Sequence, residues 1–199
     1  MKNKTNFRAP KVENIALLAA PVLHYSIFGV APREIMGETA FKKIKSEVQK
    51  RADYHCEICG RFVPHTWETK DWIHTHEAYR VDKVNKVYHL VRFVGICKEC
   101  HYFIHQSYLK IQLNNKVVSK KYYDYVIERG NRLLKAFNRK KELNTDITKS
   151  YVMEYNGERY INDYFPKRAA LKYLEGVHII HYIMVPKSLP ESLYYQAPD

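Results

Sequence analysis

The sequence predicts an α+β fold in which a β-hairpin lies between two paired-cysteine motifs, with helices on both flanks. The two C-x-x-C pairs are "CEIC" (56–59) and "CKEC" (97–100). Between them, 71–81 and 86–96 are rich in β-branched and aromatic residues with partial alternation, and "DKVN" connects the two stretches. Helical periodicity appears on either side of this core.

Three helices are predicted around the hairpin. The first covers about 41–52, and Thr39 is placed to cap it. The second opens at the later cysteine pair and covers about 98–113. The third covers about 119–137, with Ser119 as its N-cap and an apolar stripe along one face.

The C-terminal part has a different composition and predicts further strands. "YVMEYNGERYIND" (151–163) indicates a hairpin, because Asn-Gly suits a two-residue type I′ turn. A short helix at 166–174 and an apolar strand at 177–185 follow. We therefore predict three parts: an N-terminal arm and packing segment (1–40), a core with the helix that follows it (41–140), and a C-terminal hairpin and helix extension (141–199).

One apolar run, "IALLAAPVLHYSIFGVA" (15–31), raises the question of a membrane or signal segment. Pro21, His24 and Ser26 interrupt the run, and it is shorter than the roughly 20 residues that a spanning helix needs. We interpret it as a core-packing element of an intracellular, cytoplasmic protein with no membrane partner; a signal peptide is the alternative.

All four cysteines belong to the two C-x-x-C pairs, which is typical of a closed zinc site. Thiolates are the preferred ligands of structural zinc, and four fill a tetrahedron. We expect Cys56, Cys59, Cys97 and Cys100 to hold one Zn²⁺ that contributes directly to folding. Two disulfides in a secreted chain are the alternative.

Histidines near the second cysteine pair point to a second metal. His101 and His105 are four residues apart on a predicted helix, so their rings share a face. His74 and His76 are two apart on a predicted strand and also share a face. Four imidazoles from two elements suit a metal with open positions, which catalysis requires; the alternative is that they are surface residues or partners of the zinc ligands.

The core motifs resemble those of a known enzyme family. "THEAYRVD" followed by "LVRFVGICKECHYFIH" is similar to the HNH (ββα-metal, treble-clef-like) endonucleases, in particular the zinc-stapled members. "GVAPREIMG", "VVSKKYYDYVIERGNRLL" and "YNGERY" resemble an uncharacterised branch from bacteria and phages, over about residues 30–175. The resemblance implies a ββα-metal core and metal-dependent hydrolysis of DNA phosphodiester bonds.

The resemblance also implies roles for the histidines. His76 matches the strand histidine that acts as general base on the attacking water. His101 and His105 match the helix positions that hold a divalent cation, Mg²⁺ or Mn²⁺/Ni²⁺, on the scissile phosphate.

The chain departs from the family pattern at the third metal ligand. Thr75 stands where the family often has Asp or His. His74 can substitute from the same strand face, or Glu77 can reach in at a bulged strand end. In a further alternative His76 is itself the ligand and Glu77 is the base.

The family's middle Asn is also missing, because "RFVGIC" contains none. Asn85 in the predicted turn and His89 on the second predicted strand are the candidates to orient the base in its place.

A net charge of +12 and a pI of about 9.4 favour a polyanionic partner. We expect DNA contact mainly through the phosphate backbone, weakening steeply with salt, and no pattern here reads bases. The basic residues fall in two clusters: Lys42, Lys43, Lys45, Lys50 and Arg51, and then Arg129, Arg132, Lys135, Arg139, Lys140 and Lys141.

The leading hypothesis is therefore a zinc-stabilised DNA endonuclease. The alternative is a catalytically degenerate zinc module that binds DNA or a protein, such as a phage factor that blocks a host protein. A thiol-redox protein is disfavoured because no thioredoxin-like βαβ pattern surrounds either cysteine pair.

Overall fold

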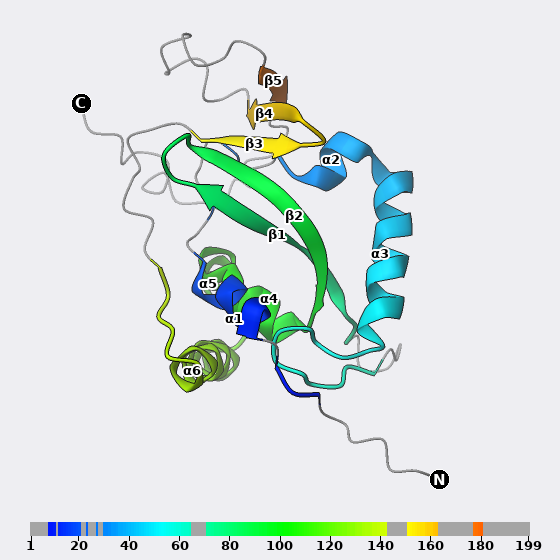
Figure 1. The fold of residues 1–199 in the computed structure, drawn as a ribbon. Helices are drawn as coiled ribbons and strands as arrows, with labels where there is room; N and C mark the ends of the chain where they lie inside the picture. The colour runs from blue at the N-terminus through cyan, green and yellow to red at the C-terminus, as the bar shows by residue number, and fades with distance from the viewer. Residues whose placement is uncertain are drawn as a thin grey trace, which may run out of the picture. The chain divides into compact units, whose positions relative to one another are not determined.

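The computed structural model describes residues 8–10, 12–20, 23, 27, 30–64, 71–142, 151–162 and 177–180. These residues form a mixed α+β protein (Figure 1). The elements, in chain order, are α1 (Val12–Ala19), α2 (Pro32–Met36), α3 (Glu38–Ala52), β1 (His74–Asp82), β2 (Val87–Ile96), α4 (Lys98–Ile104), α5 (Gln106–Asn114), α6 (Lys120–Ala136), β3 (Val152–Tyr155), β4 (Glu158–Asn162) and β5 (Val177–Ile180).

The chain divides into two compact units, each assembled from three separate segments. The first unit contains Met1–Val22, Lys43–His76 and Phe93–Leu143. The second contains Leu23–Lys42, Glu77–Arg92 and Asn144–Asp199. The cysteines and the histidines at 74, 76, 101 and 105 all belong to the first unit.

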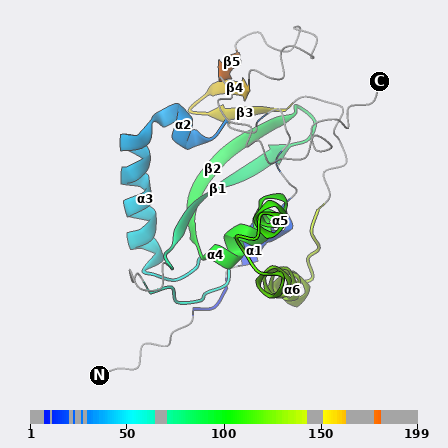
Figure 2. The ribbon, with the colours of Figure 1, turned by 180° about the vertical axis from the view of Figure 1, so that it is seen from behind.

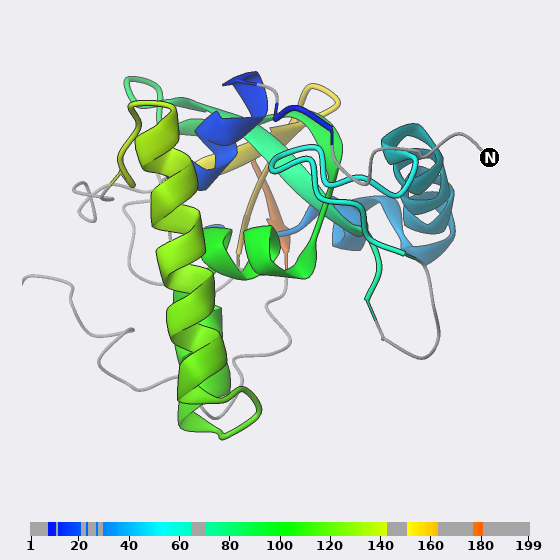
Figure 3. The same ribbon diagram turned by 90° about the horizontal axis from the view of Figure 1, so that it is seen from below.

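Helices α1, α4, α5 and α6 pack against one another in the first unit, and Figure 3 shows α6 lengthwise with α4 and α5 beside it. Phe103 of α4 is 1% exposed, and Ile15, Leu18 and Leu109 are fully buried. Gly130 permits the close approach of α6, because a Cβ there would lie 2.1 Å from the Phe103 ring. This packing fixes the position of α4, which carries the second cysteine pair.

A second close approach brings α3 to the end of β2. A Cβ on Gly95 would lie 2.8 Å from a methyl carbon of Ile73 and 2.9 Å from Cβ of Ala52. The Gln49 amide donates to the carbonyl of Ile73 at 3.2 Å. Glycine at 95 therefore lets the helix that precedes the first cysteine pair lie against the strand that precedes the second.

The five strands form one sheet in the order β1-β2-β3-β4-β5. Strand β3 runs parallel to β2 and antiparallel to β4, and β5 runs parallel to β4. Figure 2 shows the β3–β4 hairpin with β5 beside β4.

The core of the second unit forms around the C-terminal hairpin. Met153 of β3 is fully buried, with Tyr88, Tyr151, Ile27 and Val30 around it. The hairpin turns at Asn156 and Gly157, whose φ angles are 53° and 80°. Two consecutive positive φ angles define the type I′ geometry that Asn-Gly predicted.

The structure confirms most of the predicted elements and changes two of them. Ser119 caps α6, because its hydroxyl accepts from the Tyr122 amide at 3.1 Å. The Thr39 cap is wrong: α3 begins at Glu38, so Thr39 lies inside the helix, after Gly37 with its φ of 79°. The helix predicted over 98–113 is two helices that meet at His105, whose ψ of 56° leaves the helical region.

Some predicted segments lie outside the described residues: the helix at 166–174, and residues 181–185 of the last strand. In the apolar run, Ile15 and Leu18 belong to α1 and are fully buried, as a core-packing element requires. Among the described residues, no helix combines the length and the apolar character needed to cross a membrane.

Candidate metal centres

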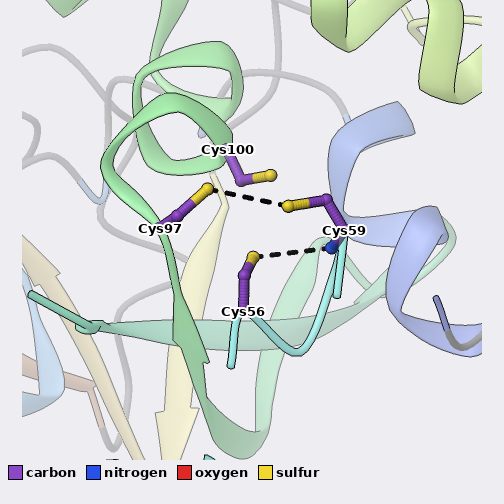
Figure 4. Close-up of side chains that lie close together, drawn as sticks. All are labelled: Cys56, Cys59, Cys97 and Cys100. Carbon is purple, nitrogen blue, oxygen red and sulfur yellow. Dashed lines mark hydrogen bonds between the residues drawn. The ribbon is translucent and has the colours of Figure 1, made fainter. Parts of the chain in front are cut away.

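The four cysteines converge on one point in the first unit (Figure 4). Cys56 and Cys59 lie on the turn after α3, while Cys97 precedes α4 and Cys100 lies in its first turn. All four are buried, and their sulfur atoms lie within 4.8 Å of one another. The predicted grouping of these residues is confirmed.

The geometry of the cysteine cluster fits a tetrahedral metal. Zinc–sulfur bonds near 2.3 Å place the corners of a tetrahedron about 3.8 Å apart. The sulfurs of Cys59 and Cys97 are 3.8 Å apart, and the Cys59 amide donates to the Cys56 sulfur at 3.5 Å. All four cysteines are free thiols, so the disulfide alternative finds no support.

The local backbone holds the first pair in a tight turn. Gly60 has a φ of 72°, and a Cβ there would collide with the carbonyl of Arg8. The Arg8 amide donates to the Gly60 carbonyl at 2.9 Å, and the Gly60 amide donates to the Cys56 carbonyl at 2.8 Å. Glycine at position 60 is therefore needed both for the backbone conformation and for the close approach of Arg8.

Electrostatics inside the cluster also favour a cation. Hydrogen bonds from Cys100, Cys56 and Cys97, together with the charge of Arg129, hold the pKa of Cys59 far below its usual value. The pKa of Cys100 is raised well above its usual value by its hydrogen bonds with Cys56 and Cys59. Four sulfurs this close do not all ionise unless a cation offsets their mutual repulsion, which is what a metal such as zinc supplies.

Two arginines lie beside the cysteine cluster. Arg129 of α6 donates to the sulfur of Cys59 at 3.0 Å and to that of Cys100 at 3.7 Å. Arg61 donates to Glu99 at 2.7 Å, and although burial lowers its pKa, the charges of Glu99 and Cys97 raise it. A zinc ion with four thiolates carries a net charge of about −2, which these guanidinium groups offset.

A second cluster consists of His76, His101 and His105. Each histidine contributes one ring nitrogen, and these three nitrogen atoms lie within 4.8 Å of one another. The ring centroid of His76 lies 5.2 Å from that of His101 and 5.1 Å from that of His105, and the last two are 4.9 Å apart. The break at His105 still preserves the bond from its amide to the His101 carbonyl at 3.0 Å, so both rings face β1.

His76 is the most deeply placed member of the histidine cluster. It is 7% exposed, and burial, with smaller contributions from the charges of His105 and Lys141, lowers its pKa to about 3. Its Nδ1 is buried with no hydrogen-bond partner. A neutral imidazole with an unsatisfied buried nitrogen is the state in which histidine coordinates a metal.

His74 lies beside the cluster rather than in it. Its Nδ1 is 3.2 Å from Nδ1 of His101, and its ring stacks on Trp72 at a centroid distance of 5.9 Å. Burial, then the charge of Lys98, lowers the pKa of His74. A hydrogen bond between these two nitrogens would orient the ring of His101.

The other predicted site residues have separate environments. Side chains alternate along a strand, so Thr75 and Glu77 point to the face opposite His76; burial raises the pKa of Glu77. His89 of β2 pairs through Nδ1 with Glu154 at 2.9 Å. Asn85 holds the β1–β2 turn by bonding the Asp82 carboxylate at 2.8 Å.

Sequence reasoning missed three residues at these centres. Arg129 looked like part of a basic surface cluster, but it contacts sulfur. Lys141 donates to the carbonyl of Leu18 at 3.1 Å, and burial lowers its pKa to about 8. Trp72 gave no signal beyond its place at the start of the first predicted strand.

Comparison with protein families, with curated proteins and with solved structures found no match to this chain.

Proposed function

We propose that this protein is a zinc-stabilised, metal-dependent nuclease of the HNH type that hydrolyses DNA phosphodiester bonds. The observation that carries the proposal is the three-histidine cluster of β1 and α4 next to a separate four-cysteine cluster. The succession β1, β2, α4, with His76 on the first strand, His101 on the helix and His105 at its end, supports the proposal, because the sequence resemblance implies a ββα-metal core.

His76, His101 and His105 would hold the cation. The sequence resemblance gave His76 the role of base, with its role as a ligand as the alternative. Its nearly equal ring distances to the two helix histidines favour the ligand role. A divalent cation held there would offset the charge that develops on the phosphodiester during hydrolysis.

The donor set has a consequence for the choice among the proposed ions. Three imidazoles suit Ni²⁺, Zn²⁺ and similar transition metals, whereas Mg²⁺ prefers oxygen ligands. Among the described residues, no carboxylate joins the cluster. We therefore expect Ni²⁺ to support activity better than Mn²⁺ or Mg²⁺.

With His76 as a ligand, the sequence resemblance leaves Glu77 as the general base. The alternation of side chains along β1 points Glu77 to the face opposite His76, so the geometry does not favour this role. The Glu77→Gln variant below tests it.

The end of α6 supports polyanion binding. A hollow of about 540 Å³ is lined by four cationic side chains, Lys135, Arg139, Lys140 and Lys141, together with Leu134 and two asparagines. Lys141 is close enough to influence the pKa of His76. Cations in a hollow are placed to contact successive phosphates.

The test is a cleavage assay with supercoiled plasmid DNA and zinc-loaded protein, in Mg²⁺, Mn²⁺ or Ni²⁺. We expect nicking or linearisation that is lost in His76→Ala and His105→Ala. In His74→Ala we expect metal affinity to fall roughly tenfold to a hundredfold, because His74 acts through His101. Absence of cleavage with every metal and every DNA form would refute the proposal that the protein is a nuclease.

His178→Ala is the matched control, because His178 is an exposed histidine paired with Glu158 at 2.8 Å in the second unit. It should cleave like the wild type. Glu77→Gln tests whether Glu77 is the base: loss of cleavage with metal binding retained would support that role.

The second candidate is a zinc module that binds without chemistry. The observation that favours it is Thr75, whose buried hydroxyl offers no carboxylate or imidazole where the family often has a ligand. Counting ions per chain separates the candidates: zinc alone, with no further ion on titration with Mn²⁺ or Ni²⁺, supports the module.

A further inference from the structure

Four tyrosines form a continuous series of ring contacts across α4, α5 and α6, and we call them, with Lys98, the tyrosine track. The rings of Tyr102 and Tyr108 are stacked at 6.2 Å. Tyr102 meets Tyr122 edge-on at 6.2 Å, and Tyr122 lies 6.3 Å from Tyr125. Tyr108 and Tyr125, at the two ends of the series, are 52% and 45% exposed.

A lysine lies at the centre of the tyrosine track. The ammonium of Lys98 is 5.6 Å from the centroid of Tyr102 and 5.8 Å from that of Tyr122. Nearby on the same helices, Lys110 and Lys120 lie over the ring of Tyr123 at 5.5 and 5.7 Å. Lysine ammonium groups therefore lie over tyrosine rings at several points along these helices.

The tyrosine track adjoins the histidine cluster. Lys98 and Tyr102 lie on α4, the same helix that carries His101 of the cluster. His74 in turn contacts His101 and stacks on Trp72, with an angle of 11° between the rings. Trp72 is 40% exposed, so an aromatic face is available beside the proposed cation.

This combination distinguishes among the possible occupants. Exposed tyrosines also occur at protein interfaces, but lysine is depleted from the centres of such interfaces. Single-stranded nucleic acid needs both groups, because its bases stack on aromatic rings while its phosphates meet cations. In a duplex the bases are already stacked on one another, so they cannot stack on the tyrosine rings.

We propose that single-stranded DNA binds along the tyrosine track, with bases stacked on Tyr108 and Tyr125 and phosphate at Lys98, and continues past Trp72 to the histidine cluster. This deepens the proposed function, on which it rests, by assigning a single-stranded or locally unpaired strand as the substrate.

The test is the fluorescence anisotropy of a labelled oligothymidine of roughly 12 nucleotides, compared with a duplex of the same length, without added divalent cation. We expect tighter binding to the single strand. Tyr108→Leu and Tyr125→Leu should each weaken that binding about fivefold, because each removes one stacked base. Tyr125→Phe keeps the aromatic face and should bind like the wild type.

Tyr54→Leu is the matched control, since Tyr54 is 46% exposed and lies outside the track, with its ring edge-on to Phe62. Zinc content and circular dichroism confirm that each variant is folded. Equal affinity for single strand and duplex, or equal losses in Tyr54→Leu and Tyr125→Leu, would overturn the proposal.

The two proposals fail separately, because the binding assay requires no cleavage. If the protein cuts duplex plasmid but does not prefer the single strand, the nuclease proposal stands and the tyrosine-track proposal fails. If the protein binds the single strand through Tyr108 and Tyr125 but cuts no DNA, the tyrosine-track proposal stands and the nuclease proposal fails.

Discussion

Arg129 is the residue that joins α6 to the cysteine cluster. Its guanidinium donates to two sulfurs that come from different cysteine pairs. Burial lowers its pKa, but the negative charge and hydrogen bond of Cys59 raise it by more, so the side chain stays charged. We therefore expect Arg129 to act both on the retention of a metal in this cluster and on the docking of α6.

Replacing Arg129 with Met should destabilise the first unit and speed the loss of zinc. Removal of a charge-assisted hydrogen bond costs about 1–2 kcal/mol once partial solvent exposure is allowed for. Urea unfolding and the rate of zinc transfer to a coloured chelator measure the two effects. Arg132→Met is the control, because Arg132 pairs with Glu128 on the exposed face of the same helix. Equal zinc-transfer rates in the two variants would contradict the role of Arg129.

Lys141 predicts a pH dependence of stability. Burial lowers its pKa from 10.5 in the unfolded chain to about 8 in the folded protein. Between these values the unfolded chain binds more protons, so this residue makes the free energy of unfolding rise with pH from about 8 to 10.5. Lys141→Met removes that increase, and urea midpoints at pH 7 and near pH 10 measure it.

The difference in midpoint between wild type and Lys141→Met should shift in favour of the wild type as the pH rises. Lys140→Met is the control, since Lys140 is the exposed neighbour. A difference that stays constant across this pH range would show that Lys141 has an ordinary pKa.

At the scale of elements, the contact between α4 and α6 depends on Gly130. Alanine normally favours a helix over glycine by about 1 kcal/mol. At Gly130 the added methyl would lie 2.1 Å from the Phe103 ring, and overpacking of this kind costs about 1–3 kcal/mol. We therefore expect Gly130→Ala to lower the free energy of unfolding despite its better helix propensity.

Thermal or urea unfolding of a double-mutant cycle tests this contact. Phe103→Leu alone should destabilise the core, but Gly130→Ala added to Phe103→Leu should cost less than it does in the wild type. If the two changes add independently, the methyl group does not meet the ring.

The elements that the sequence predicted best are those defined by local chemistry. Ser119 caps α6 through a bond to an amide three residues away, and Asn156-Gly157 adopts the turn its residue types favour. The cysteine pairs were recognisable because metal coordination restricts both residue type and spacing.

What the sequence did not predict depends on contacts between distant segments. The break at His105 interrupts a continuous helical pattern, and no local residue type marks it. Arg129 contacts Cys59, 70 positions earlier, so its role could not be separated from that of a surface arginine. The pairing of His89 with Glu154 spans 65 positions and is equally invisible in a local pattern.

For the whole molecule, the net charge of +12 favours a polyanionic partner, and the proposed DNA binding should weaken with salt. Three lysines and one arginine line the hollow at the end of α6. If each neutralises one phosphate of a duplex, log K against log salt has a slope of about −3 to −4. Filter binding or anisotropy over a salt series measures the slope.

Variants in the hollow locate this effect. Arg139→Gln should reduce the steepness of the slope by about one. Lys121→Gln is the control, since Lys121 is an exposed residue near the other end of α6, outside the hollow. A slope that is unchanged in Arg139→Gln, or changed equally in both variants, would place the phosphate contacts elsewhere.

The interleaved composition of the two units has a consequence for biosynthesis. The first unit takes its segments from Met1–Val22, Lys43–His76 and Phe93–Leu143, and the stretches between them belong to the second unit. Cys56 and Cys59 therefore leave the ribosome well before Cys97 and Cys100, and at about 5–20 residues per second the gap lasts a few seconds. During that interval the nascent chain presents two unpartnered thiols, so the timing of zinc delivery relative to translation decides whether they are coordinated or oxidised.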